Sequence, residues 1–307
     1  MNSPVRQISI CICTYKRSEG LLRALQSLVG MTTPAECSLE IIVVDNEAAG
    51  SAAPVVERIR QTNSALNIRY ILESRPGVSH ARNRCLDTAT GEVLAFIDDD
   101  EFVHGEWLVE LLRCMDNTCA DAVFGPVVPY FEVPPTAWLL ASGVNDRMRF
   151  ATGTELPWQE ARTGNVMLRR TMIDGGHRFS TDFARTGGED SLFFAAAQQR
   201  GSKLVWCDEA VVQESVPVQR MARSWVLHRA FMGGRTYVRL EARMGRRWPY
   251  PYFALRGLVA ALVSVVTIAT LYVRRDTRHV RHLCRLYGHL GKMAACFYSR
   301  GPYAGDL

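Results

Sequence analysis

Residues 91–101, GEVLAFIDDDE, run from an apolar segment straight into a block of acids. The apolar part, residues 93–97, is short and unbroken, which is typical of a strand buried on both faces of a parallel sheet. Four carboxylates follow at the carboxyl end of that strand: Asp98, Asp99, Asp100 and Glu101. Open α/β sheets bind ligands at this edge, and clustered carboxylates favour a neutralising cation such as Mg²⁺ or Mn²⁺, which usually arrives with phosphates. The alternative is a solvated acidic turn that caps the next helix.

The first half of the chain alternates between strand and helix patterns. Apolar strand patterns occupy residues 8–13, 40–44 and 68–72 ahead of the acidic strand, and helical patterns lie between them. Four such repeats with short connections favour an α/β fold with a mostly parallel sheet flanked by helices. Further strands are expected at residues 121–128, 163–168 and 203–206.

The loop after the first strand excludes two common ways of binding phosphate. Residues 13–20, CTYKRSEG, contain neither the G-x-G-x-x-G run of dinucleotide-binding proteins nor a G-x-x-x-x-G-K-[ST] loop. A metal held by carboxylates, together with arginine side chains, is the remaining way to bind a diphosphate.

A second informative stretch is RTGGED, residues 185–190, directly ahead of a helical pattern. Its two glycines allow close approach of the backbone to a ligand. Glu189 and Asp190 fall in the first turn of the helix, where the dipole favours ionised carboxylates. An ionised carboxylate beside a cleft is a candidate general base, although helix capping without chemistry is the alternative.

The charge is distributed unevenly over the 307 residues. The net charge of +5 divides into 20 basic and 28 acidic residues in 1–216, and 16 basic and 3 acidic residues in 217–307. We therefore expect a catalytic domain over 1–216 and a basic, helical, membrane-associating region over 217–307. The nine cysteines are scattered without a CxxC pair, and the polar start of the chain predicts no signal peptide, so a cytosolic catalytic body is expected.

The basic region contains an uncharged apolar segment. Residues 257–273 would form a helix of roughly 25 Å, which is short for a bilayer span. Arginines flank it on both sides, which favours a helix lying in the cytoplasmic leaflet over a single span, with an ordinary buried helix as the third possibility. The segment is too apolar for an arm that faces nucleic acid.

Four segments in this order resemble the inverting family 2 glycosyltransferases of the GT-A fold: ISICICTYKR, IIVVDN, GVSHARNRCLDTATGEVLAFIDDDE and GGED. Within that family the sequence is most similar to bacterial exopolysaccharide enzymes of the succinoglycan type, and the likeness covers residues 8 to about 210. The resemblance implies transfer of a sugar, with Mn²⁺ or Mg²⁺, from a nucleotide sugar to a saccharide or lipid-linked saccharide acceptor. UDP is the favoured nucleotide, and the cytoplasmic face of the inner membrane is the expected location.

The resemblance also assigns residues. It places Thr14, Tyr15, Asp45, Arg75, Arg82, Asp98 and Asp99 on the donor. It gives metal contact to Asp100 and Asp98, and the acceptor side to Asn165 and Gly188. Asp190 matches the catalytic base, and Glu189 shapes its environment or touches the acceptor.

Three alternatives are weighed against this interpretation. A sugar-1-phosphate nucleotidyltransferase would need a glycine-rich loop after the first strand. A processive synthase would carry Q-x-x-R-W, whereas residues 220–225 are RMARSW, so single addition is expected. An inactive saccharide-binding scaffold is disfavoured because Asp98, Asp100 and Asp190 are all present.

Overall fold

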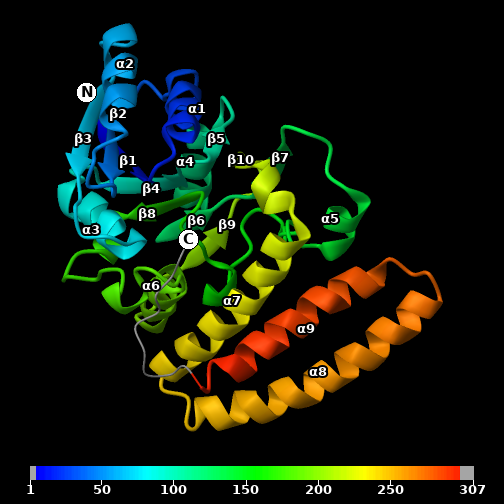
Figure 1. Ribbon diagram of the computed structural model, residues 1–307. Coiled ribbons are helices and arrows are strands. Elements are labelled where there is room, and N and C mark those ends of the chain that lie inside the picture. The colour runs from blue at the N-terminus through cyan, green and yellow to red at the C-terminus, as the bar shows by residue number, and fades with distance from the viewer. Residues whose placement is uncertain (1–4, 298–307) are drawn as a thin grey trace. The chain divides into compact units, whose positions relative to one another are not determined.

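The computed structural model describes residues 5–297, and its larger unit is built on a seven-stranded sheet (Figure 1). The strand order is β3-β2-β1-β4-β8-β6-β9. Strands β1 to β4 are parallel, while β8 runs antiparallel to both of its neighbours. The bounds are β1 Arg6–Thr14, β2 Cys37–Asp45, β3 Asn67–Leu72, β4 Val93–Asp98, β6 Ala122–Phe124, β8 Val166–Arg169 and β9 Leu204–Trp206. The GT-A-like, mostly parallel α/β sheet is confirmed.

Helices cover both faces of this sheet because its strands alternate apolar side chains between two cores. Ile10 of β1 belongs to the core beneath α1 (Ser18–Val29), α2 (Ala53–Thr62) and α4 (Trp107–Thr118). Cys11, the next residue, belongs to the core on the opposite face. That core is covered by α3 (Val78–Thr88) and α6 (Glu189–Gln199).

A second sheet of three strands, in the order β5-β10-β7, corrects one expectation. It contains β5 Glu101–Val103, β10 Val212–Val216 and β7 Val127–Phe131. Residues 121–128 therefore contain all of β6 and the first two residues of β7, which belong to different sheets. The break falls at Gly125 and Pro126, where proline has no N–H for a ladder hydrogen bond. Short 3₁₀ turns lie at Trp158–Glu160, Arg170–Met172, Thr181–Phe183 and Val218–Met221.

The chain divides into two compact units, each of which is built from several segments of the sequence. The first comprises 1–129, 147–185 and 189–215, and the second comprises 130–146, 186–188 and 216–307. Two segments from earlier in the chain belong to the second unit. One contains α5 (Ala137–Ser142), which packs against α9, and ends at Asp146, which pairs with Arg281. In the other, the Thr186 carbonyl oxygen accepts a hydrogen bond from Thr236 Oγ1 at 3.0 Å.

Three long helices make up most of the second unit: α7 Arg223–Arg243, α8 Pro249–Val273 and α9 Arg278–Ala294. Helix α9 packs against both α7 and α8 (Figure 1). Glycines permit backbone contact between α7 and α9: a Cβ at Gly291 would lie 1.9 Å from the carbonyl oxygen of Phe231. A Cβ at Gly234 would lie 2.0 Å from the carbonyl oxygen of Gly288.

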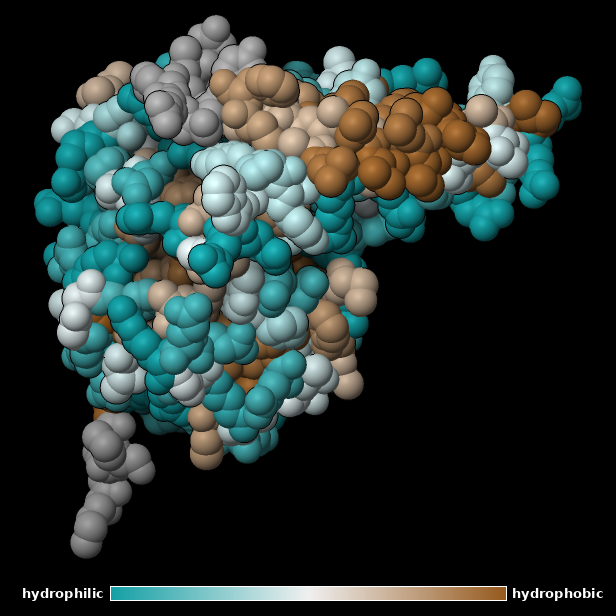
Figure 2. Space-filling model, turned by 90° about the horizontal axis from the view of Figure 1, so that it is seen from below, coloured by the Kyte–Doolittle hydropathy of each residue, from teal (hydrophilic) through white to brown (hydrophobic). Residues whose placement is uncertain are grey.

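Helix α8 is longer than the uncharged segment that predicts it. It begins at Pro249 and has 25 residues, or about 37 Å, so the expected helix length of roughly 25 Å was wrong. Within residues 5–297 it is the one helix long and apolar enough to cross a membrane, with a mean hydropathy of 2.0. Hydrophobic side chains gather in a band along it (Figure 2). Exposed members are Leu255, Leu258, Val259, Leu262, Val263, Val265 and Val266. Only 17% of the most apolar 18-residue stretch of α8 is buried. The alternative of an ordinary buried helix is therefore wrong.

Candidate active site

The four acids run from Asp98, the last residue of β4, through a tight turn to Glu101, the first residue of β5, and their environments differ. Asp98 is the most accessible, with 45% of its side chain exposed. Asp99 and Glu101 are buried. Helix α1 approaches this turn closely because residue 20 is glycine: a Cβ there would lie 2.6 Å from the carbonyl oxygen of Asp99. The turn is thus fixed by the first helix of the fold.

Asp99 is held by the last residue of β1 and by an arginine in the loop that follows it. Its carboxylate accepts hydrogen bonds from Thr14 Oγ1 at 2.8 Å and from Arg17 Nη1 at 2.9 Å. Arg17 Nη1 also lies 2.9 Å from Asp100 Oδ2. Burial raises the pKa of Asp99 to about 6, against the opposing effect of Arg17. Arg17 was missed at the sequence level, although a basic residue in the loop next to an acidic turn is the signal that identifies it.

Glu101 stabilises the turn through a hydrogen bond to the backbone. Its Oε2 accepts a hydrogen bond from the backbone N–H of Asp98 at 2.9 Å. Burial raises the pKa of Glu101 well above its usual value, and the charge of Asp98 adds to this effect. Gly164 makes room for the contact, because a Cβ there would lie 2.6 Å from Glu101 Oε1 and 3.3 Å from Asp98 Oδ2.

Arg82, on α3, joins the acidic turn to the start of α6. Its guanidinium forms an ion pair with Glu189 and lies 3.5 Å, Nη2 to Oδ1, from Asp98. Burial disfavours its charge, but the carboxylates of Glu189, Asp98 and Asp190 outweigh burial and raise the pKa of Arg82. Arg82, which the resemblance places on the donor, is therefore a buried cation that contacts carboxylates of both the acidic turn and α6.

Glu189 and Asp190 open α6 in different environments. Burial raises the pKa of Glu189, Arg82 opposes this shift, and Asp190 adds to it. Glu189 Oε2 is buried and has no hydrogen-bond partner in the described part of the chain. Asp190 is partly exposed, and its Oδ1 accepts a hydrogen bond from the Ser191 N–H at 2.7 Å. Gly188, just before Glu189, has φ +103°, a value that only glycine adopts readily.

Asp45, at the end of β2, is fully buried and orders the following loop. Its carboxylate accepts hydrogen bonds from the backbone N–H groups of Glu47 and Ala52, both at 2.9 Å, and from the Tyr70 hydroxyl at 3.1 Å. Tyr15, directly after β1, is exposed. Asp45 thus fixes the conformation of the loop at the carboxyl end of β2, where the resemblance places the donor base.

Asn46 was missed at the sequence level as a residue that positions Arg75. Its Nδ2 donates to the carbonyl oxygens of Glu73 and Arg75 at 2.8 and 2.7 Å, and its Oδ1 accepts from the Gly77 N–H at 2.8 Å. These bonds tie the loop after β3 to the end of β2. The Arg75 side chain is exposed and pairs with Glu73 at 2.8 Å.

Asn165, expected on the acceptor side, is fully buried. Its Oδ1 accepts from Trp107 Nε1 at 2.7 Å, and its Nδ2 donates to the carbonyl oxygens of Pro126 and Ala210 at 3.0 and 2.7 Å. This geometry gives the Asn165 side chain a positioning function, in which it holds together the segments around β8.

The turn offers two carboxylates for a divalent ion. Within residues 5–297, no group of three or more His, Cys, Asp or Glu side chains is arranged to hold a metal by itself. Asp99 and Glu101 are buried, whereas Asp98 is the most accessible of the four and Asp100, which pairs with Arg17 at 2.9 Å, has 14% of its side chain exposed, so Asp98 and Asp100 are the candidates. Two carboxylates fit Mg²⁺ or Mn²⁺, because such ions commonly take their remaining ligands from water and substrate phosphates.

These features define an α/β protein with an acidic turn at the carboxyl edge of its sheet and a buried arginine beside that turn. The model of the family Glycosyl transferase family 2 matches residues 9–175. The succinoglycan biosynthesis protein ExoM of Rhizobium meliloti (strain 1021) is 37% identical over 298 residues, which cover 95% of this chain and 93% of that protein. The chain therefore belongs to glycosyltransferase family 2, and the resemblance to exopolysaccharide enzymes is confirmed.

More distant similarities agree with this assignment. The glucosyl-dolichyl phosphate glucuronosyltransferase of Haloferax volcanii is 24% identical over 74% of this chain and 75% of its own. The solved mannosyltransferase PcManGT from Pyrobaculum calidifontis, in complex with GDP-Man and Mn²⁺, has a TM-score of 0.66 at 15% identity and covers 96% of this chain and 88% of its own. Residues 1–349 of S. aureus TarS, in complex with UDP, have a TM-score of 0.56 at 17% identity. The match covers 98% of this chain and 94% of the TarS chain. These two structural likenesses establish the fold.

Proposed function

Beyond family membership, we propose that this chain is an inverting glycosyltransferase that uses a nucleotide sugar, with UDP as the favoured nucleotide. The acceptor is a hydroxyl of a saccharide or lipid-linked saccharide in exopolysaccharide or cell-surface glycan synthesis. The observation that carries the proposal is Arg82, which contacts Glu189 beside Asp190 and lies 3.5 Å from Asp98. One buried cation thus joins the acidic turn to the candidate base. The UDP in the TarS complex, the GDP-Man and Mn²⁺ in the PcManGT complex and the name of ExoM support this donor, metal and pathway.

The proposed donor site lies at the carboxyl ends of the parallel strands. Asp45, Thr14 and Tyr15 border the nucleoside, Arg75 and Arg82 face the diphosphate, and Asp98 and Asp99 border the ribose. Asp98 and Asp100 would hold Mg²⁺ or Mn²⁺. The ion would neutralise charge on the diphosphate as the nucleotide leaves.

The proposed transfer step uses Asp190 as the general base. Its carboxylate takes the proton of the acceptor hydroxyl as the oxygen bonds to the anomeric carbon from the face opposite the nucleotide. The bond between that carbon and the diphosphate oxygen breaks, and its electron pair leaves with the nucleotide diphosphate. A donor with an α-linkage gives a β-linked product. Glu189 and Gly188 shape the acceptor side, and Arg82 holds Glu189 in place.

Helix α8 gives the proposed location. Its exposed apolar side chains fit a membrane surface, and the arginines that follow it fit anionic lipid at the cytoplasmic face. We propose peripheral association or one C-terminal membrane segment there, with no nucleic-acid partner.

The experiment compares wild type, Asp190→Asn and Asp174→Asn with a panel of UDP- and GDP-sugars and a membrane lipid extract. Asp174 is exposed and lies outside the site, so it provides the matched control. We expect Asp190→Asn to lower kcat by about 10²- to 10⁴-fold while nucleotide-sugar binding is retained. EDTA should abolish transfer, and added Mn²⁺ or Mg²⁺ should restore it. Full transfer by Asp190→Asn would refute the role of Asp190, and binding without transfer by the wild type would favour an inactive scaffold.

A further inference from the structure

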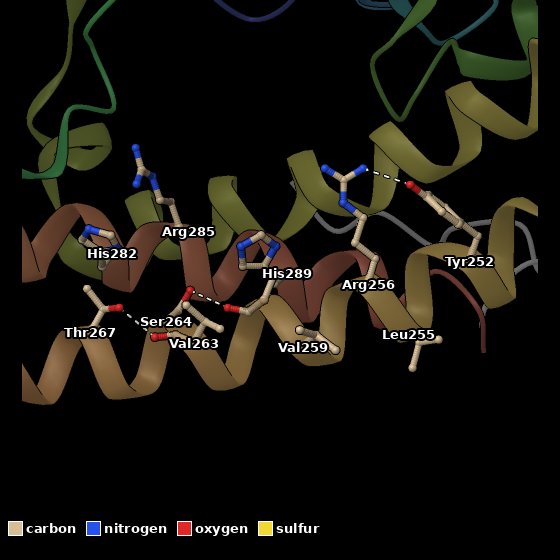
Figure 3. A pocket seen from close by; sticks show the side chains of 11 residues that line it. Tyr252, Leu255, Arg256, Val259, Val263, Ser264, Thr267, His282, Arg285 and His289 are labelled. Carbon is tan, nitrogen blue, oxygen red and sulfur yellow. Dashed lines mark hydrogen bonds between the residues drawn. The ribbon is translucent and has the colours of Figure 1, made fainter.

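Helices α8 and α9 line an open groove of about 630 Å³ (Figure 3). One side is apolar and includes Leu255, Val259 and Val263, all of which are exposed. On the other side, basic and imidazole groups follow one another along the helices: His282, Arg285, His289 and Arg256. The groove therefore has the amphiphilic character of a binding site for a molecule with an apolar part and a polar head.

The polar side of the groove carries positive charge without a compensating acid. Neither α8 nor α9 contains an Asp or a Glu. In the described chain Arg256 donates to the Tyr252 hydroxyl at 3.2 Å, and neither Arg256 nor Arg285 forms an ion pair with a carboxylate. By contrast, Arg278 pairs with Asp276 and Arg281 pairs with Asp146.

Both arginines affect the same side chain in the groove, His289. Burial has the largest effect and lowers the pKa of His289, and the positive charges of Lys292, Arg256 and Arg285 lower it further. Burial and the charges of Arg285 and Arg278 likewise lower the pKa of His282. The cations therefore repel one another, and an anion placed among them would relieve that repulsion.

We propose that this groove binds the phosphate headgroup of an anionic membrane lipid, with Arg256 and Arg285 as its direct ligands. The acyl chains then lie along the apolar side of α8, and His282 and His289 offer further hydrogen bonds to the phosphate oxygens. The inference rests on the proposed association of α8 with a membrane, and it adds recognition of a phosphate group. Arginine suits this task because its planar guanidinium binds phosphate in a bidentate manner.

The test is flotation of the full chain with vesicles of phosphatidylcholine alone, or with phosphatidic acid or phosphatidylglycerol at equal mole fraction. The groove variant is Arg256→Gln/Arg285→Gln. The matched control is Arg274→Gln/Arg275→Gln, which removes the same charge from the turn after α8, outside the groove lining. At ~1 kcal/mol per surface arginine, loss of diffuse charge alone should weaken binding to phosphatidic acid vesicles about 30-fold in either variant. The groove variant should lose at least about five-fold more than the control, because its two arginines also donate charge-assisted hydrogen bonds directly to the phosphate. Both variants should retain binding to phosphatidylcholine alone.

The outcomes distinguish failure of the phosphate-binding groove from failure of the proposed membrane association. Equal losses by the two variants would overturn the groove, because the charge would then act diffusely. Displacement of the protein from phosphatidic acid vesicles by inorganic phosphate, at an ionic strength matched with chloride, would indicate a site for a free anion and overturn the lipid assignment. If wild type floats with none of the vesicles, membrane association itself fails. Circular dichroism of both variants shows whether either has lost its helices.

Discussion

The buried arginine on α3 gives the sharpest test of how the candidate active site is held together. Arg82 is 7% exposed and Glu189 is 5% exposed. Replacement of Arg82 by Gln leaves the Glu189 carboxylate in a buried site beside Asp190, without its cation. Loss of one partner of a buried ion pair typically costs about 3–5 kcal/mol. We expect a loss of that order in the free energy of unfolding at pH 7.5.

The loss should depend on pH with a definite sign. In the variant, the pKa of Glu189 rises further above that of the unfolded chain, about 4.3, because burial and Asp190 remain while Arg82 is gone. The folded variant therefore binds a proton that the unfolded chain releases, and its stability falls as pH rises from about 4 toward neutrality. The difference between variant and wild type should be larger at pH 7.5 than at pH 5.

Urea unfolding at the two pH values, followed by circular dichroism, measures this difference. Arg113→Gln is the matched control, because Arg113 is also paired with a glutamate, Glu110, but the two side chains are 59% and 21% exposed. We expect little change in its unfolding midpoint at either pH. If Arg82→Gln unfolds at the same urea concentration as wild type at pH 7.5, the ion pair does not hold the site together.

Two further predictions use pairs of glycines that differ in the space around them. Gly20→Ala places a Cβ 2.6 Å from the Asp99 carbonyl oxygen and should destabilise the fold by about 1–3 kcal/mol. Gly30→Ala, whose nearest neighbour is 3.8 Å away, should not, and equal melting temperatures for the two variants would contradict the close approach of α1 to the acidic turn. Gly291→Ala places a Cβ 1.9 Å from the Phe231 carbonyl oxygen, whereas Gly288→Ala places one 3.6 Å from that of Ala230. Limited proteolysis should therefore cut α9 faster in Gly291→Ala alone, and equal protection of the two would show that α7 and α9 are not in backbone contact.

The fold was largely predictable because its first half is specified locally. Each strand is a short apolar run, and each ends in polar residues before a helix begins. The antiparallel position of β8 between β4 and β6 was not predictable in this way, because strand pairing across many residues leaves no local pattern. The break at Gly125 and Pro126 was visible in the sequence as turn residues and was overlooked.

Polar residues at strand ends were harder to interpret than the strands themselves. The sequence predicts Asp45 at the end of a strand, and the resemblance places Asn165 on the acceptor side. Their side chains nevertheless bond to backbone groups and to Tyr70 and Trp107 within the protein. A ligand contact and a loop-holding contact require the same residue types, so composition alone does not distinguish them.

The same argument explains why four consecutive acids and one Glu-Asp pair do not act as interchangeable charges. Burial divides the acidic turn into residues that hold it, Asp99 and Glu101, and a more accessible Asp98. At the start of α6, successive residues are rotated by about 100°, so Glu189 meets Arg82 while Asp190 stays partly exposed. A base must reach its acceptor hydroxyl directly, which favours Asp190 over its neighbour. Arg82 thereby gives adjacent carboxylates different tasks, since it engages one of them and leaves the other accessible.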